Sequence, residues 1–305
     1  MLQQFRRGKR TAMQASHHGG VASSRQASRW LRRVIACTAV AAIFISLPAG
    51  AWNANADRLV TNQAVDTLPD DIRPFFEASR QFLVQHVIDA RDELARAPGT
   101  KPYHYIDLDH YAPFPYTALP RDYKAATAKF SRTAIAAHGQ LPWQIGLYSA
   151  RLTDSFRAKN WETARVNAAF LAYYVAEAHD PFNTTAITDP RTAPESRVDH
   201  RFGSSLFDRY SLFFFIHPSP AAYVSDPTDH AFEICLTAHS YIEQILLADA
   251  RARQGLPDYT DEYYDRFYNQ AGAILVRQLS DAATDVGSYW LTSWTNAGKP
   301  SLPGH

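Results

Sequence analysis

The chain has 305 residues, of which 46% are hydrophobic and 20% charged, and its formal net charge is +1. This balance excludes an intrinsically disordered chain, a coiled coil and a collagen-like repeat, and the length is sufficient to bury a substantial core. The near-zero net charge conceals an uneven distribution, because the first 51 residues carry eight basic residues and no acidic one.

This N-terminal segment has the three parts of a secretory signal peptide. Basic residues come first, a 17-residue apolar run follows from Val34 to Gly50, and Ala49-Gly50-Ala51 places small residues where a signal peptidase reads them. A membrane anchor is the alternative, but the run is shorter than the roughly 20 residues that a spanning helix needs. We therefore expect a signal peptide over residues 1–51, no stable membrane span after cleavage, and a secreted or periplasmic protein.

Cleavage after Ala51 would leave 254 residues that begin at Trp52. Without the eight basic residues of the leader, 23 of the 31 remain against 30 acidic ones, and the net charge becomes −7. Such an acidic chain lacks the general electrostatic footprint of a protein that binds duplex nucleic acid. Its one remaining cysteine, Cys235, cannot form an internal disulfide, and its apolar surroundings predict a buried side chain.

Beyond the leader, apolar residues recur at helical spacings. The pattern predicts helices over residues 69–96, 121–137, 142–158, 160–180, 202–216, 229–253 and 260–296. Two loops interrupt it: residues 97–119, which contain HYIDLDHY, and residues 181–200, which are polar and contain three prolines. No segment shows the sustained apolar–polar alternation of a strand. The sequence therefore predicts one all-α domain over residues 52–305.

The familiar catalytic motifs are absent from the sequence. It contains no H-E-x-x-H, no G-x-S-x-G, no Walker loop and no dinucleotide fingerprint. A chemical site would have to come from scattered histidines and carboxylates near helix ends. Nitrogen and oxygen ligands of this kind suit hard and borderline metal ions.

Several segments, taken in order, resemble one superfamily. They are AWN at the cleavage site, HYIDLDHY, GQLPWQI, AEAHDPFNTT, DHRFGSSL and the terminal SYWLTSWTNAGKP. Together they resemble the zinc-dependent phospholipase C and single-strand-specific nuclease superfamily, in a bacterial branch, over essentially all of the mature chain. The resemblance implies a secreted, single helical domain of the phospholipase C/nuclease type, with a cluster of three zinc ions that hydrolyses phosphate esters.

The resemblance also implies a set of metal ligands at the start of the mature chain. Trp52 would bind zinc through its carbonyl and the amine that cleavage frees, and Asp57 stands where the family has a histidine five residues later. Asp89 lies fifteen residues before His104 of HYID and matches the aspartate that bridges two zinc ions, with Asp92 as its rival. In the family's mechanism this aspartate helps to hold the attacking water, so Asp89 is the predicted catalytic residue.

The family's H-x-x-x-D-x-H-x-P-x-H motif falls on Tyr173, Glu177, His179, Pro181 and Asn183. Glu177 can still coordinate a metal, whereas tyrosine and asparagine are poor zinc ligands. His179 matches a position that is not usually a ligand. We interpret it as a hydrogen-bonded structural histidine, with recruitment as a ligand as the alternative.

The last family motif is a histidine followed four residues later by a carboxylate. One alignment places Asp199 and Gly203 at these positions, and the other places His200 and Ser204 there. Each alignment loses one ligand. Asp199 and His200 both remain candidate metal ligands.

The resulting hypothesis is a secreted, metal-dependent phosphodiesterase with a rearranged site that binds one to three zinc ions, fewer than three being expected. Its substrate would be a phosphate ester, either a phospholipid or a single-stranded nucleic acid. Aromatic residues beside HYID would stack a base, cover an acyl chain or belong to the core: Tyr103, Tyr105, Tyr111, Phe114 and Tyr116. The alternative is a catalytically degenerate homologue that binds a phosphate-bearing ligand or serves an envelope role. Zinc content distinguishes the two, and the oligomeric state stays open.

Overall fold

A computed structural model describes residues 52–187 and 197–303. The predicted signal peptide lies outside these residues, as does its cleavage motif. Within the described part the fold is all-α: it has no strand, and one isolated β-bridge joins Ile106 to Gly139. The prediction of an all-α single domain is confirmed at this level.

The first half of the fold leads to the central helix. Its helices are α2 (Ala54–Asp66), α3 (Arg73–His86), α4 (Asp89–Arg96), α5 (Tyr123–Phe130), α6 (Arg132–Ala137), α7 (Leu141–Arg157) and α8 (Trp161–Ala178). Short 3₁₀ turns lie between them at Pro98–His104 and Leu108–Tyr111, and a third follows α8 at Pro181–Thr184.

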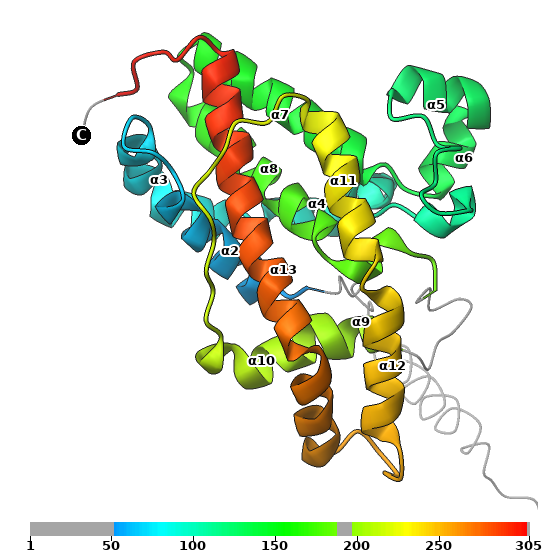
Figure 1. Cartoon of the computed structure of the whole chain (residues 1–305). Helices are drawn as coiled ribbons and strands as arrows, with labels where there is room; N and C mark the ends of the chain where they lie inside the picture. The colour runs from blue at the N-terminus through cyan, green and yellow to red at the C-terminus, as the bar shows by residue number, and fades with distance from the viewer. Residues whose placement is uncertain (1–51, 188–196, 304–305) are drawn as a thin grey trace, which may run out of the picture. The chain divides into compact units, whose positions relative to one another are not determined.

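The second half begins with α9 (Val198–His200), a π-helical turn at Arg201–Ser205, α10 (Leu206–Tyr210) and a 3₁₀ turn at Ser211–Phe213. It ends with α11 (Pro227–His239), α12 (Ile242–Arg253) and the 36-residue α13 (Asp261–Asn296). Figure 1 shows α13 running along α2 and α8, with α11 and α12 beside it. No helix in the described part is both long and apolar enough to cross a bilayer.

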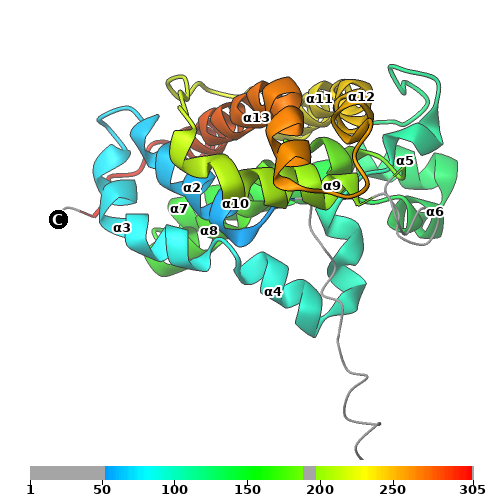
Figure 2. The ribbon, with the colours of Figure 1, turned by 90° about the horizontal axis from the view of Figure 1, so that it is seen from below.

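Helix α8 lies at the centre of the domain, and its C-terminal turns position the candidate site. The Asn160 side chain caps its N-terminus by accepting a hydrogen bond from the Thr163 backbone N–H. Every residue from Leu171 to Ala178 is buried, because α8 packs against α2, α3, α7 and α13. Figure 2 shows this packing from below, with α13, α11 and α12 above the layer that contains α2, α7 and α8. A helix covered all round brings any polar residue in its last turns into the interior.

The helix boundaries differ from the sequence-based ones at three breaks, one omission and one early end. The helix predicted at 202–216 begins as a π-helical turn and ends at Tyr210, followed by a 3₁₀ turn and then non-helical chain. Residues 69–96 form two helices with a turn at Val87 and Ile88, and residues 121–137 divide at Ser131, which has a φ of 70°. Residues 229–253 divide after His239. Helix α2 was not predicted, since its sequence is largely polar and buries one narrow face around Val60 and Ala64.

Candidate functional site

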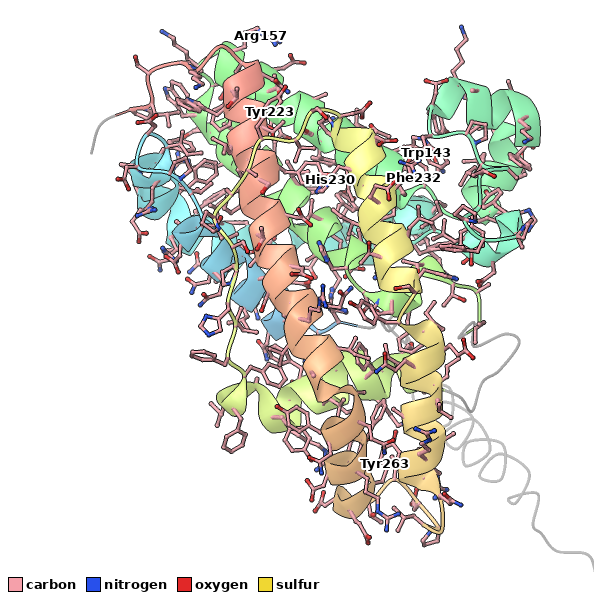
Figure 3. All side chains as sticks on the ribbon, viewed as in Figure 1. Trp143, Arg157, Tyr223, His230, Phe232 and Tyr263 are labelled. Carbon is pink, nitrogen blue, oxygen red and sulfur yellow. The ribbon has the colours of Figure 1, made fainter. Side chains whose placement is uncertain are left out.

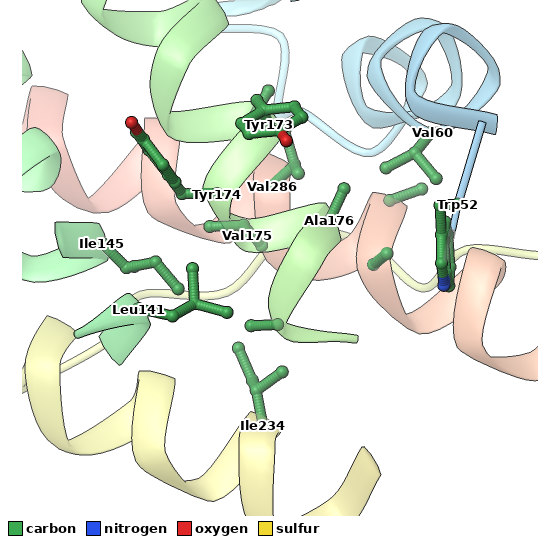
Figure 4. Close-up of a cluster of buried hydrophobic side chains, with 14 of the residues drawn as sticks. Trp52, Val60, Leu141, Ile145, Tyr173, Tyr174, Val175, Ala176, Ile234 and Val286 are labelled. Carbon is green, nitrogen blue, oxygen red and sulfur yellow. The ribbon is translucent and has the colours of Figure 1, made fainter. Parts of the chain in front are cut away.

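An arginine side chain lies among the predicted metal ligands. Arg91 Nη2 donates a hydrogen bond to the Trp52 carbonyl oxygen at 2.9 Å and another to Asp57 Oδ2 at 2.8 Å. The same atom is 3.6 Å from Glu177 Oε1. Trp52, Asp57 and Glu177 are all buried, and Figure 4 shows Trp52 and Tyr173 among the surrounding core side chains. The structure brings these three predicted metal ligands together, and a guanidinium stands between them.

The HYID histidine joins the same cluster through a tyrosine. His104 Nδ1 and the Tyr173 hydroxyl are 3.0 Å apart, and the Arg91 guanidinium carbon lies 5.8 Å from the centre of the Tyr173 ring. Tyr173 stands at a histidine position of the motif that the sequence resembles, and it is buried one helical turn before Glu177. The His104–Tyr173 contact therefore commits one ring nitrogen of His104 to a hydrogen bond, while its Nε2 is buried without a hydrogen-bond partner in the described part.

Residues that follow α8 complete the cluster. Asn183 donates from Nδ2 to Glu177 twice, to the backbone oxygen at 3.1 Å and to Oε2 at 3.2 Å. Asp180 accepts a hydrogen bond on Oδ1 from the Phe182 backbone N–H at 2.9 Å. Its Oδ2, like Asp199 Oδ1, is buried and has no hydrogen-bond partner among residues 52–187 and 197–303. Asn183 thus acts here as an amide donor that holds Glu177 in place.

The cluster contains more carboxyl groups than basic groups, and its pKa values reflect this. Burial raises the pKa of Glu177 to about 8, with a further contribution from Asp57 and an opposing one from Arg91. Burial also raises the pKa of Asp57, and it raises that of Asp180 well above the usual range with help from Glu177 and Asp199. Carboxylates that are buried near one another resist ionisation unless a cation is close.

The two basic groups respond in opposite directions. Burial disfavours the charged form of Arg91, but Asp57 and Glu177 more than offset this, and the pKa of Arg91 is raised. Burial, with a smaller contribution from Arg91, lowers the pKa of His104 to about 4. At neutral pH the cluster therefore contains a charged guanidinium, a neutral imidazole and a Glu177 side chain that is mostly protonated.

Asp89, the predicted catalytic residue, has a different neighbour. Its Oδ2 pairs with His86 Nδ1 at 2.8 Å, and both side chains are 42% exposed. Asp89 and Arg91 are two residues apart on α4, so their side chains point in directions about 200° apart around the helix axis. The side of α4 that faces the cluster is the one that carries Arg91.

Of the two remaining candidate ligands, one faces the cluster. Asp199 contributes to the raised pKa of Asp180, which places it within electrostatic range of the buried carboxylates. His200 Nδ1 is 3.3 Å from the Ser205 hydroxyl, and burial, followed by Arg197, lowers its pKa.

The donor set does not fit the zinc cluster that the resemblance implies. In the described part of the chain, no group of three or more His, Cys, Asp and Glu side chains is arranged to hold a metal ion. The oxygens of Trp52, Asp57 and Glu177 instead surround the Arg91 guanidinium. A zinc ion about 4 Å from a guanidinium would experience a repulsion on the order of 8 kcal/mol at an effective dielectric constant of 20.

The aromatic side chains beside HYID have mixed environments. Tyr111 is buried, Tyr103 packs against the core, and Phe114 is exposed. The Tyr116 hydroxyl is 2.7 Å from His239 Nε2 on α11, and the Tyr105 hydroxyl donates to the Ala137 carbonyl. Most of these side chains therefore pack or hydrogen-bond against neighbouring elements and hold the loop in position.

A second polar group, half-buried between α11 and α13, was not predicted. Asp285 accepts from His179 Nε2 at 2.9 Å and from His230 Nε2 at 2.8 Å, and these hydrogen bonds lower its pKa against the effect of burial. Figure 3 shows His230 between α11 and α13. His179 is thus a hydrogen-bonded structural histidine in this structure, as interpreted from the sequence.

Arg91 was not among the site residues predicted from the sequence. One property of the sequence bears on it, namely its distance of two residues from Asp89. Side chains two residues apart do not share a helix face, so only one of Asp89 and Arg91 can point into the cluster. Comparison with known proteins adds nothing to this choice: no protein-family model matches the chain, and no curated protein matches it significantly.

Proposed function

We propose that this chain is an exported, non-hydrolytic protein of the phospholipase C/nuclease type, which serves a binding role in the cell envelope. The observation that carries this proposal is the position of Arg91, whose guanidinium contacts the Trp52 carbonyl, Asp57 and Glu177. In the superfamily that the sequence resembles, the corresponding groups hold a metal ion. A permanent cation here supplies the positive charge that these oxygens need, without supplying a Lewis acid or a metal-bound water.

The neighbouring substitutions support the same interpretation. Tyr173 and Asn183 stand at two histidine positions of the motif, and each makes a hydrogen bond within the cluster. Together with Arg91 they form a connected network around Glu177. Replacement of metal ligands by residues that satisfy one another is expected when a site keeps its structural role after losing its ion.

The charge of the cluster also bears on the ligand. Asp57, Glu177, Asp180 and Asp199 outnumber the one arginine, so a phosphate group placed here would meet net repulsion whenever they are ionised. We therefore expect the binding surface of the protein to lie elsewhere on the domain.

The second candidate function is the metal-dependent phosphodiesterase. It is favoured by the surplus of acceptors: Asp180 Oδ2, Asp199 Oδ1 and His104 Nε2 are buried without hydrogen-bond partners in the described part. A divalent ion would use such atoms, provided that Arg91 moved away from the carboxylates. The two candidate functions therefore make opposite predictions about zinc.

The test is zinc per chain, measured by elemental analysis on protein that begins at Trp52, together with hydrolysis of a chromogenic phosphodiester. Wild type is expected to contain no stoichiometric zinc and to show no zinc-dependent turnover. The double variant Arg91→Met/Asn183→His removes the guanidinium and restores one histidine, so its zinc content should rise, whereas Arg96→Met on the same helix should not change it. Stoichiometric zinc with turnover in wild type, abolished by Glu177→Gln, would establish the phosphodiesterase instead.

A further inference from the structure

Three large apolar side chains project into solvent just after α10. Leu212, Phe213 and Phe215 are 94%, 76% and 72% exposed, and we call them the apolar prong. Their neighbours Phe214 and Ile216 pack against the core, and the Phe214 ring lies 5.7 Å from that of Phe207. The prong is therefore the outward side of a segment whose inward side is anchored.

The chain that follows the prong is fixed to α13 along its length. Backbone N–H groups of residues 217–224 donate to hydroxyls that recur every fourth residue on α13, at distances of 2.8–3.1 Å. The pairs are His217 with Ser280, Ser219 with Thr284, Ala222 with Ser288 and Val224 with Thr292. Figure 3 shows this segment beside α13, with Tyr223 near its end, and the Tyr223 hydroxyl donates to Asn296. These hydrogen bonds fix the segment that follows the prong against α13. The exposure of the prong is therefore a feature of the fold.

The charged side chains next to the prong are acidic in excess, because Asp208, Asp261 and Asp265 stand beside one base, Arg209. Asp208 accepts a hydrogen bond from Asn53, Arg209 pairs with Asp261, and the Tyr210 hydroxyl donates to Asp265. Asn53 and Tyr210 are neutral, so Asp208 and Asp265 keep their negative charge, and this surface does not attract an anionic partner. Recognition at the prong must therefore depend on apolar contact.

The apolar area of the prong shows whether a second protein or a lipid bilayer is the better partner for it. One leucine and two phenylalanines at these exposures present roughly 450 Å² of apolar surface. Stable protein–protein interfaces bury about 800 Å² per partner, so the prong alone is too small for a stable dimer. Contiguous apolar patches of this size on a monomer are often functional, and adjacent Leu and Phe side chains on a projection suit insertion at the headgroup–acyl boundary of a bilayer.

We propose that the apolar prong docks the protein onto a lipid bilayer surface, with Leu212, Phe213 and Phe215 inserted into the interfacial region. Because the flanking side chains carry a net negative charge, the docking does not draw on anionic lipid. This inference rests on the exposed side chains and their support on α13, and it is independent of whether the buried cluster binds zinc.

The test is sedimentation of the protein beginning at Trp52 with vesicles of phosphatidylcholine, alone or with a minority of phosphatidylglycerol. Wild type should pellet with both, and Phe213→Ser and Phe215→Ser should each lower the partition coefficient about tenfold, as expected for an aromatic side chain removed from an apolar environment. Leu247→Ser on α12, where the wild-type side chain is 47% exposed, is the matched control and should bind as wild type does. All these positions are exposed, so the melting temperatures should agree.

A second measurement reports on insertion directly. The Leu212→Cys variant can be labelled with an environment-sensitive fluorophore because Cys235 is buried. Vesicles should shift its emission to shorter wavelength. Wild type that stays in the supernatant, prong variants that bind equally well, or a labelled residue with unshifted emission would each overturn the proposal. A concentration-dependent dimer that Phe213→Ser abolishes would identify a second copy of the chain as the partner and would also overturn it.

Discussion

Replacing Arg91 by methionine tests directly what the guanidinium contributes to the fold. Methionine keeps an unbranched apolar chain but removes two charge-assisted hydrogen bonds, at 2.9 Å to the Trp52 carbonyl and at 2.8 Å to Asp57. Each such bond contributes about 1.5–3 kcal/mol. The substitution also leaves Asp57 and Glu177 buried without their cation, and breaking a buried pair in this way costs about 3–5 kcal/mol.

The estimate from the two hydrogen bonds and the estimate from the broken ion pair are similar. We therefore expect a decrease of about 3–5 kcal/mol in the free energy of unfolding at pH 8. For a domain of this size the melting temperature should fall by roughly 10 °C. The decrease should be smaller at pH 5, because Glu177, whose pKa is about 8, is then protonated and needs no counter-charge.

The assay is thermal and urea unfolding, followed by circular dichroism, at pH 5 and pH 8. Arg96→Met is the matched control: Arg96 is exposed in the last turn of the same helix, and its loss should cost at most about 1 kcal/mol. If Arg91→Met melts within 2 °C of Arg96→Met, or if its effect is the same at both pH values, the account of Arg91 as the counter-charge of the buried carboxylates is refuted.

Three further predictions concern neighbouring features. Burial raises the pKa of Glu177 from its ordinary 4.5 to about 8, so between these values the folded state holds a proton that unfolding releases. Stability should therefore fall as the pH rises from about 4.5 to about 8, by up to about 1.4 kcal/mol per unit, and Glu177→Gln should flatten this slope in urea titrations. Asp285→Asn weakens two hydrogen bonds to histidines and should cost about 2–3 kcal/mol at pH 7, measured by the same unfolding assay; an unchanged midpoint would contradict it. Gly139 has a φ of +89°, and a Cβ there would lie 2.0 Å from a backbone oxygen, so Gly139→Ala should cost about 3 kcal/mol, whereas Gly255→Ala, at a φ of +75° in open space, should cost about 1 kcal/mol; equal melting of the two would contradict it.

The long helices could be predicted because their apolar positions repeat without interruption. The pattern predicted residues 260–296 for α13, which spans Asp261–Asn296, and residues 142–158 for α7, which spans Leu141–Arg157. The predicted helix at 202–216 was wrong beyond Tyr210. Residues 211–213 form a 3₁₀ turn and Phe214 is extended, which leads into the segment 217–224 whose backbone N–H groups bond to hydroxyls on α13. No local pattern in the sequence reveals such distant partners.

Part of the candidate site could be predicted from the spacing of its residues along the sequence. Trp52, Asp57, His104 and Glu177 do lie in one cluster, because the motif spacing reflects where helices place their side chains. The choice of Asp89 depended on a count of fifteen residues, which carries no information about which side of α4 faces inward. That orientation is set by packing around α8, and the structure turns Arg91 toward the carboxylates.

The central claim is that a guanidinium, and not a metal ion, balances the buried carboxylates, and calorimetric titration of zinc into the wild-type protein beginning at Trp52 tests it most directly. Arg91 is expected to keep zinc from the cluster, so wild type should show no saturable binding in the micromolar range, while Arg91→Met should gain it. Tight, stoichiometric binding by wild type that Glu177→Gln weakens would show that zinc displaces the arginine and would contradict the claim.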